Sequence, residues 1–118
     1  MIELHQFIKS VSHALRGIKT VYRTEQSFRL QLLVGLITII FSILIQIKTV
    51  EFIVVIMLIV SVLILELVNS IFERISDSFK PRIHPIIKDV KDIMAGAVLM
   101  VSILSVVIGV LIFYPYIR

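Results

Sequence analysis

The sequence predicts an all-α integral membrane protein with three transmembrane helices and one further helix at the surface. Hydrophobic residues make up 58% of the 118 residues, and the mean hydropathy is +1.07, well above the range of soluble domains. Three apolar stretches approach the length of about 20 residues that a helix needs to cross a bilayer. We expect residues 1–118 to form a single domain.

The N-terminal residues 2–24 show the pattern of an amphipathic helix. Apolar side chains such as Phe7 and Leu15 recur every three or four positions, and the opposite side carries polar and basic residues such as Lys9 and Arg16. A basic amphipathic helix beside a membrane span is expected to lie in the interface, with its cations near anionic headgroups. A helix that packs on soluble protein is the alternative.

The three predicted spans cover approximately residues 29–47, 51–73 and 92–114. The connection between the first two is very short, which makes them an antiparallel hairpin. Residues 76–90 contain Pro81 and Pro85, and because proline interrupts helices we expect a loop there.

The basic residues are distributed unevenly between the predicted loops. Five precede the first span: Lys9, Arg16, Lys19, Arg23 and Arg29. Five more lie between the second and third spans: Arg74, Lys80, Arg82, Lys88 and Lys91. The positive-inside rule therefore predicts a multi-pass membrane protein with its N-terminus and the 74–91 segment in the cytoplasm and its C-terminus outside. This topology accounts for the net charge of +4 without a nucleic-acid partner.

A polar stripe ends the second predicted span. It consists of Glu66, Asn69, Ser70, Glu73 and Asp77. At 100° per residue these side chains share one face of a helix. An acidic residue near the middle of a bilayer costs about 2.5–3.5 kcal/mol, so such residues usually serve a function. We expect the active site of the chain at this stripe.

Other charged residues lie at the same membrane depth. Glu25 precedes the first span, and Lys91 and Asp92 open the third. Carboxylates below a cation-rich loop suit a divalent metal together with a polyphosphate, because Mg²⁺ prefers one or two carboxylates plus phosphate oxygens. Phosphoryl transfer needs little more than positioning, charge neutralisation and a base.

The order of these residues resembles a known family. The run Glu66-Leu-Val-Asn69-Ser70-Ile-Phe-Glu73-Arg-Ile-Ser-Asp77, followed by His84-Pro85 and Lys91-Asp92, is similar to the pattern of the prokaryotic diacylglycerol kinase and undecaprenol kinase family. The resemblance covers nearly the whole chain. The Ile71-Phe72 pair departs from the family's small residue and isoleucine. Both side chains project away from the carboxylate face, so we expect altered helix packing there.

The resemblance implies an ATP-dependent lipid kinase of the bacterial cytoplasmic (inner) membrane that forms a homotrimer with shared active sites. It would transfer the γ-phosphate of MgATP to a lipid hydroxyl in the membrane. Undecaprenol is the favoured acceptor, giving undecaprenyl phosphate, because the absence of tryptophan and the Tyr114-Pro115-Tyr116 ending resemble that branch. Diacylglycerol, giving phosphatidic acid, is the alternative.

The resemblance also implies roles for individual residues. Glu66 is the implied general base, and Asn69 orients groups beside it. Glu25 and Glu73 would hold Mg²⁺, and Ser70 and Asp77 support the polar face. The residues implied to bind the nucleotide are Gln6, His13, Glu25, Glu73, Arg82, Ile83, His84, Lys91 and Asp92.

Other interpretations of these residues stay open. Asn69 and Ser70 can join membrane helices through hydrogen bonds, and Glu25 can be a favourable charge at a helix N-terminus. A small proton-coupled transporter also depends on an intramembrane glutamate, although it would normally have four spans. A scaffold protein would tolerate the loss of all these carboxylates.

Overall fold

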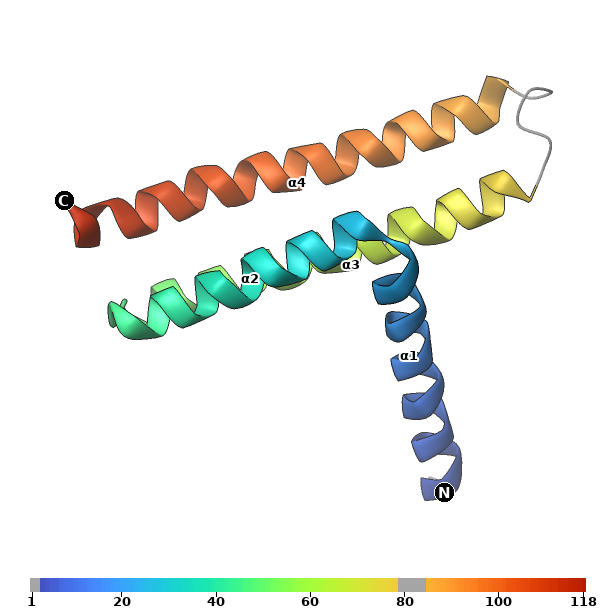
Figure 1. Ribbon diagram of the computed structural model, residues 1–118, viewed down its shortest axis with the longest axis horizontal. Helices are drawn as coiled ribbons and strands as arrows, with labels where there is room; N and C mark the ends of the chain where they lie inside the picture. Colours follow the sequence, from blue (N-terminus) through green and yellow to red (C-terminus); the bar gives the residue numbers. More distant parts are fainter. Residues whose placement is uncertain (1–2, 79–84) are drawn as a thin grey trace.

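The computed structural model of the chain describes residues 3–78 and 85–118, and these ranges form four helices (Figure 1). They are α1 (Leu4–Thr24), α2 (Gln26–Leu44), α3 (Thr49–Asp77) and α4 (Pro85–Ile117). No strand occurs in either range. Three of the helices, α2, α3 and α4, are long and apolar enough to cross a membrane. The prediction of an all-α chain with three membrane-spanning helices is confirmed.

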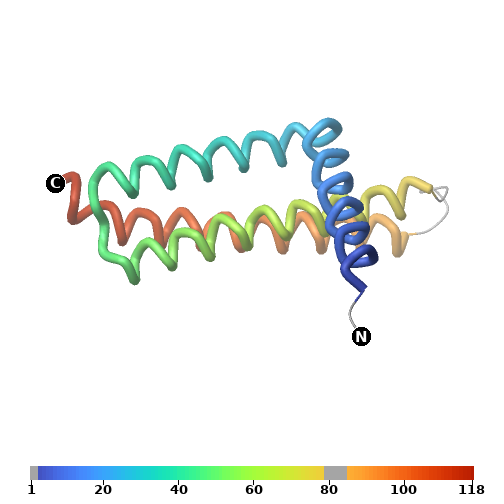
Figure 2. The backbone as a smooth tube through the Cα atoms, turned by 90° about the horizontal axis from the view of Figure 1, so that it is seen from below, coloured from blue at the N-terminus to red at the C-terminus, as the bar shows by residue number. Residues whose placement is uncertain are grey.

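Helices α2, α3 and α4 run side by side along the length of the molecule, and α1 points away from them (Figures 1 and 2). Helix α3 contacts both α2 and α4. The junction of α1 with α2 lies beside the second half of α3, whereas the C-terminus lies at the other end of the bundle. The polar stripe of α3 therefore lies at the end of the bundle from which α1 departs.

The bend between α1 and α2 occurs at Glu25, whose backbone is extended with φ −112° and ψ 110°. Arg29 stabilises this bend, because its Nη1 donates hydrogen bonds to the carbonyl oxygens of Tyr22 at 2.8 Å and Arg23 at 3.0 Å. Carbonyls in the last turn of a helix lack partners within that helix, and a cation is favourable there.

Helices α2 and α3 approach closely at Gly35, which is buried. A Cβ atom built on Gly35 would lie 2.7 Å from Cγ2 of Ile59. The absence of a side chain is therefore what allows this approach. The α2–α3 connection includes Gln46 with a positive φ of 57°, in the left-handed region that tight turns require.

The start of α4 differs from the sequence-based expectation. Residues 85–90 were expected within a loop over 76–90, but α4 begins at Pro85 and α3 continues to Asp77. Proline is well suited to the first position of a helix, because its missing N–H would have no partner there. Residues 79–84, which include Pro81, lie outside the described part of the chain.

Much of the apolar surface lies open in the single chain. Within the described residues, the buried apolar side chains are Val21, Phe28, Val55, Val62 and Ile112. Large apolar residues are exposed along all four helices, for example Leu15 on α1 and Met100 on α4. Exposed apolar area of this extent marks surfaces that meet lipid or other protein.

Candidate active site

The first part of the site is a contact between Glu66 of α3 and Ser27 of α2. Glu66 is 6% exposed, and Ser27 Oγ donates a hydrogen bond to its Oε2 atom at 3.0 Å. Ser27 lies in the first turn of α2, which starts at Gln26. The partial positive charge of a helix N-terminus favours a nearby carboxylate. A buried carboxylate thus has a hydrogen-bond donor and a favourable helix end beside it.

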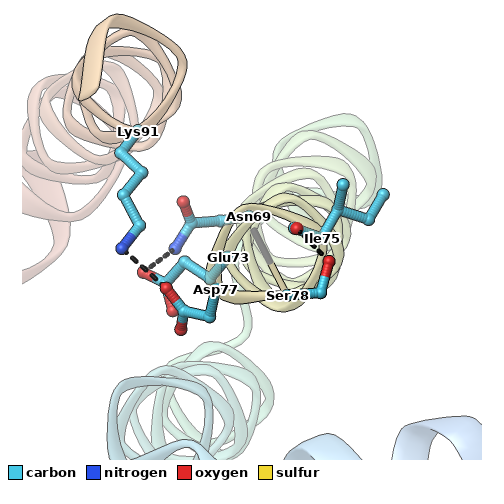
Figure 3. Close-up of polar contacts among 6 residues, drawn as sticks. All are labelled: Asn69, Glu73, Ile75, Asp77, Ser78 and Lys91. Carbon is cyan, nitrogen blue, oxygen red and sulfur yellow. Dashed lines mark hydrogen bonds and ion pairs between the residues drawn. The ribbon is translucent and has the colours of Figure 1, made fainter. Parts of the chain in front are cut away.

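The second part of the site lies between α3 and α4 (Figure 3). Asn69 Nδ2 donates a hydrogen bond to Glu73 Oε1 at 3.3 Å. Lys91 Nζ reaches across from α4 and lies 2.9 Å from Asp77 Oδ1. Figure 3 shows Asn69, Glu73 and Asp77 on the side of α3 that Lys91 approaches. Two carboxylates, an amide and a cation therefore meet at this end of the bundle.

The charge of Lys91 is maintained by its surroundings. Lys91 precedes both the third predicted span, residues 92–114, and the uncharged stretch that begins at Ile93. The hydrogen bond and the negative charge of Asp77 raise the pKa of Lys91, and the charge of Glu73 adds to this effect. Lys91 is therefore a cation at neutral pH and can contact an anion such as a phosphate group.

A third set of contacts joins the site to α1. Ser70 is 2% exposed, and Arg74 Nε donates a hydrogen bond to its Oγ at 3.3 Å. The same guanidinium donates through Nη2 to Thr24 Oγ1 at 2.8 Å. Since Thr24 is the last residue of α1, Arg74 holds the end of α1 beside the polar stripe.

The remaining predicted site residues are more dispersed. Glu25 lies half-buried at the α1–α2 junction and Asp92 is exposed on α4; neither makes a side-chain hydrogen bond or ion pair with the described residues. Gln6 and His13 are exposed on α1, where His13 Nδ1 lies 3.4 Å from Arg16 Nη1. Three further predicted residues lie outside the described part of the chain, namely Arg82, Ile83 and His84.

The oxygen donors of the site fit a hard divalent cation. Within residues 3–78 and 85–118, no three histidine, aspartate or glutamate side chains form a group that could hold a metal unaided. Mg²⁺, however, is commonly bound through one or two carboxylates together with substrate phosphates and water. The Glu73 carboxylate, only partly buried and fixed by Asn69, suits such a shared site.

Sequence reasoning missed two residues of this region, Ser27 and Arg74. The contact of Ser27 with Glu66 joins residues 39 positions apart, and no local pattern marks it. Arg74 follows Ser70 by four positions, so helical spacing places the two side chains together. This spacing could have identified Arg74 as a neighbour of the polar stripe. Its charge served only to predict the membrane topology of the chain.

The chain is similar to known proteins along most of its length. Residues 12–113 match the family described as prokaryotic diacylglycerol kinase. The chain belongs to this family. It is 36% identical over 113 residues to the undecaprenol kinase of Bacillus subtilis (strain 168), covering 96% of this chain and 92% of the relative. It is 30% identical over 101 residues to the diacylglycerol kinase of Synechocystis sp. (strain ATCC 27184 / PCC 6803 / Kazusa), covering 85% of this chain and 58% of that relative.

Membership of this family confirms the predicted class of activity. The chain is a lipid kinase, a multi-pass membrane enzyme that uses ATP to phosphorylate a lipid. ATP-dependent phosphoryl transfer generally requires a divalent metal, in keeping with the oxygen donors of α3. The transporter and scaffold interpretations of the carboxylate stripe are no longer needed.

Proposed function

We propose that this lipid kinase transfers the γ-phosphate of ATP to the hydroxyl group of undecaprenol, giving undecaprenyl phosphate. The observation that carries this proposal is the 36% identity with an undecaprenol kinase over nearly the full length of both chains. The similarity to a diacylglycerol kinase is lower and covers 58% of that relative. Diacylglycerol, giving phosphatidic acid, is therefore the alternative substrate.

In this proposal Glu66 is the general base. Its carboxylate is buried among helices at the end of an apolar segment, where a lipid hydroxyl can meet a water-soluble nucleotide. A base must lie within hydrogen-bond reach of the proton that it removes. Glu66 would accept the proton of the lipid hydroxyl, and Asn69, three positions later, would orient the neighbouring groups.

Glu73 and Glu25 are the proposed carboxylate ligands of Mg²⁺, which when bound neutralises the negative charge of the nucleotide phosphates. Lys91 is proposed to contact the nucleotide, and its cationic side chain already faces the carboxylates of α3 (Figure 3). Ser70 and Asp77 would support this face. The other proposed nucleotide-binding residues are Gln6, His13, Arg82, Ile83, His84 and Asp92.

A cavity of about 510 Å³ lies between α2, α3 and α4, and we propose that it holds the lipid tail. Its wall is mainly apolar and includes Gln31 and Val62. Gln31 lies four residues after Ser27, and Val62 four residues before Glu66, so the cavity ends about one helical turn, or ~5.4 Å, from the proposed base. A tail in this cavity would bring its hydroxyl group to Glu66.

We further propose the orientation and the assembly. The distribution of lysine and arginine supports a cytoplasmic N-terminus and active site, with the C-terminus outside the cytoplasmic membrane. The exposed apolar residues of α1 support a position in the membrane interface. A homotrimer with shared active sites would cover part of the exposed apolar surface.

Transfer of radiolabelled phosphate from ATP in mixed micelles tests the function. Undecaprenol and diacylglycerol are offered separately, and Glu66→Gln is the matched inactive control. We expect label on undecaprenol and none with the variant, which keeps its nucleotide binding because it loses a base rather than a ligand. Preference for diacylglycerol would select the alternative, and no label on either lipid would refute both.

A further inference from the structure

We propose that Ser27 is a positioning residue that holds the carboxylate of Glu66 so that one oxygen faces the acceptor hydroxyl. The proposal rests on the proposed role of Glu66 as the base. It assigns to Ser27 a part in the reaction that acts through Glu66 and not through direct contact with the nucleotide.

The two carboxylate oxygens of Glu66 differ in their surroundings. Oε2 accepts the hydrogen bond from Ser27 Oγ at 3.0 Å. Oε1 has no hydrogen-bond partner among residues 3–78 and 85–118. Every side-chain oxygen in this part of the chain that is fully buried does have a partner. Oε1 therefore reaches the surface of the single chain. The bond to Ser27 thus leaves the accessible oxygen free to accept a proton.

This division matches what the transfer step requires. As the lipid oxygen forms its bond to the γ-phosphorus, the bond from that phosphorus to the β–γ bridging oxygen breaks and ADP leaves. The hydroxyl proton passes to Glu66 Oε1. A misplacement of about 1 Å in such a geometry can lower the rate by about 100-fold, so a fixed carboxylate is an advantage.

Ser27 is well placed to fix this geometry. It lies in the first turn of α2, where the Glu25 carbonyl oxygen accepts a hydrogen bond from the Arg29 N–H at 3.3 Å. Its short side chain has one rotatable bond to the hydroxyl, whereas the glutamate side chain has three. The bond to Ser27 therefore removes more conformational freedom from Glu66 than from Ser27. The competing explanation is that the bond between Ser27 and Glu66 only stabilises the packing of α2 against α3.

Lipid phosphorylation by the full-length protein in mixed micelles separates these explanations. We expect Ser27→Ala to lower kcat by about tenfold, with the KM values for ATP and lipid changed less than about twofold. Ser27→Thr keeps a hydroxyl at the same position and should restore kcat to within about twofold of wild type. Ser61→Ala is the matched control, because the Ser61 hydroxyl bonds only the Met57 carbonyl on the same helix, among the described residues.

A double-mutant cycle tests whether Ser27 acts through Glu66. In Glu66→Asp the carboxylate is one methylene shorter and should lie beyond hydrogen-bond reach of Ser27 Oγ, so adding Ser27→Ala should cause no further loss of kcat. Equal losses in both backgrounds would overturn the proposal. Unchanged kcat in Ser27→Ala, a rise in lipid KM alone, or an Ala-like loss in Ser27→Thr would overturn it as well. Full turnover by Glu66→Gln would instead refute the role of Glu66 itself.

Discussion

Tyr116 in the last turn of α4 donates a hydrogen bond to the carboxylate of Glu51 in the first turn of α3. The backbone N–H of Lys48 joins the same cluster, donating to Glu51 Oε1 at 3.2 Å and to Tyr116 Oη at 3.3 Å. This cluster lies at the opposite end of α3 from the polar stripe. It ties α4 to the α2–α3 connection without contact with the candidate active site.

Removal of the Tyr116 hydroxyl should therefore separate stability from catalysis. We expect Tyr116→Phe to lower the thermal unfolding temperature in detergent, because Glu51 loses its side-chain donor. The kcat for lipid phosphorylation should stay unchanged. Circular dichroism and the phosphate-transfer assay measure the two quantities. Tyr114→Phe is the matched control for unfolding, since Tyr114 donates no side-chain hydrogen bond within the described residues. Equal unfolding temperatures for both variants would contradict the prediction.

The contact of Gly35 with Ile59 leads to a second prediction. Gly35→Ala would place a Cβ 2.7 Å from Ile59 Cγ2, and because a β-branched side chain has little rotamer freedom in a helix, the helices must separate. Overpacking of this kind costs about 1–3 kcal/mol. SDS titration in mixed micelles, followed by circular dichroism, should show this loss in the free energy of unfolding.

Two controls make the glycine test specific. A Cβ on Gly109 would meet no atom within 4 Å, so Gly109→Ala should not destabilise the protein. Ile59→Ala removes Cγ2, so the double variant Gly35→Ala/Ile59→Ala should lose less stability than the sum of the two single variants. Additive losses would show that the contact does not limit the approach of α2 and α3.

The fold was largely predictable because apolar length alone defines a membrane helix, as the match of α2, α3 and α4 to the three predicted spans shows. The polar stripe was predictable for a similar reason, since helical spacing places Glu66 and Glu73 on one face. Contacts between helices were not predictable, because spacing within one segment says nothing of its neighbour. The bonds of Ser27 to Glu66 and of Lys91 to Asp77 are of this kind. The helical start at Pro85 was missed because proline ends helices and also begins them.

Arg74 should control the attachment of α1 to the bundle. Its guanidinium bridges Ser70 on α3 and Thr24 at the end of α1. We expect Arg74→Met to free the α1–α2 junction and to speed trypsin cleavage after Arg23 in detergent, measured by mass spectrometry of the fragments. Thr24→Val breaks the same bond from the other side and should have the same effect. Unchanged cleavage in both variants would show that Arg74 does not hold the α1–α2 junction.

The activities of the Glu73→Gln and Glu66→Gln variants should depend differently on the concentration of Mg²⁺. Glu73→Gln removes a proposed ligand charge but keeps an oxygen that can accept the Asn69 hydrogen bond, so the local structure should survive. We expect this variant to need about tenfold more Mg²⁺ for half-maximal activity and to regain most of its kcat at saturation. Glu66→Gln should lack activity at every Mg²⁺ concentration, because it removes the proton acceptor. Titration of lipid phosphorylation with Mg²⁺ at fixed ATP measures both, with the exposed Glu3→Gln as the control for loss of a carboxylate. Identical titration curves for Glu73→Gln and Glu66→Gln would show that the two glutamates do not divide metal binding and base catalysis between them.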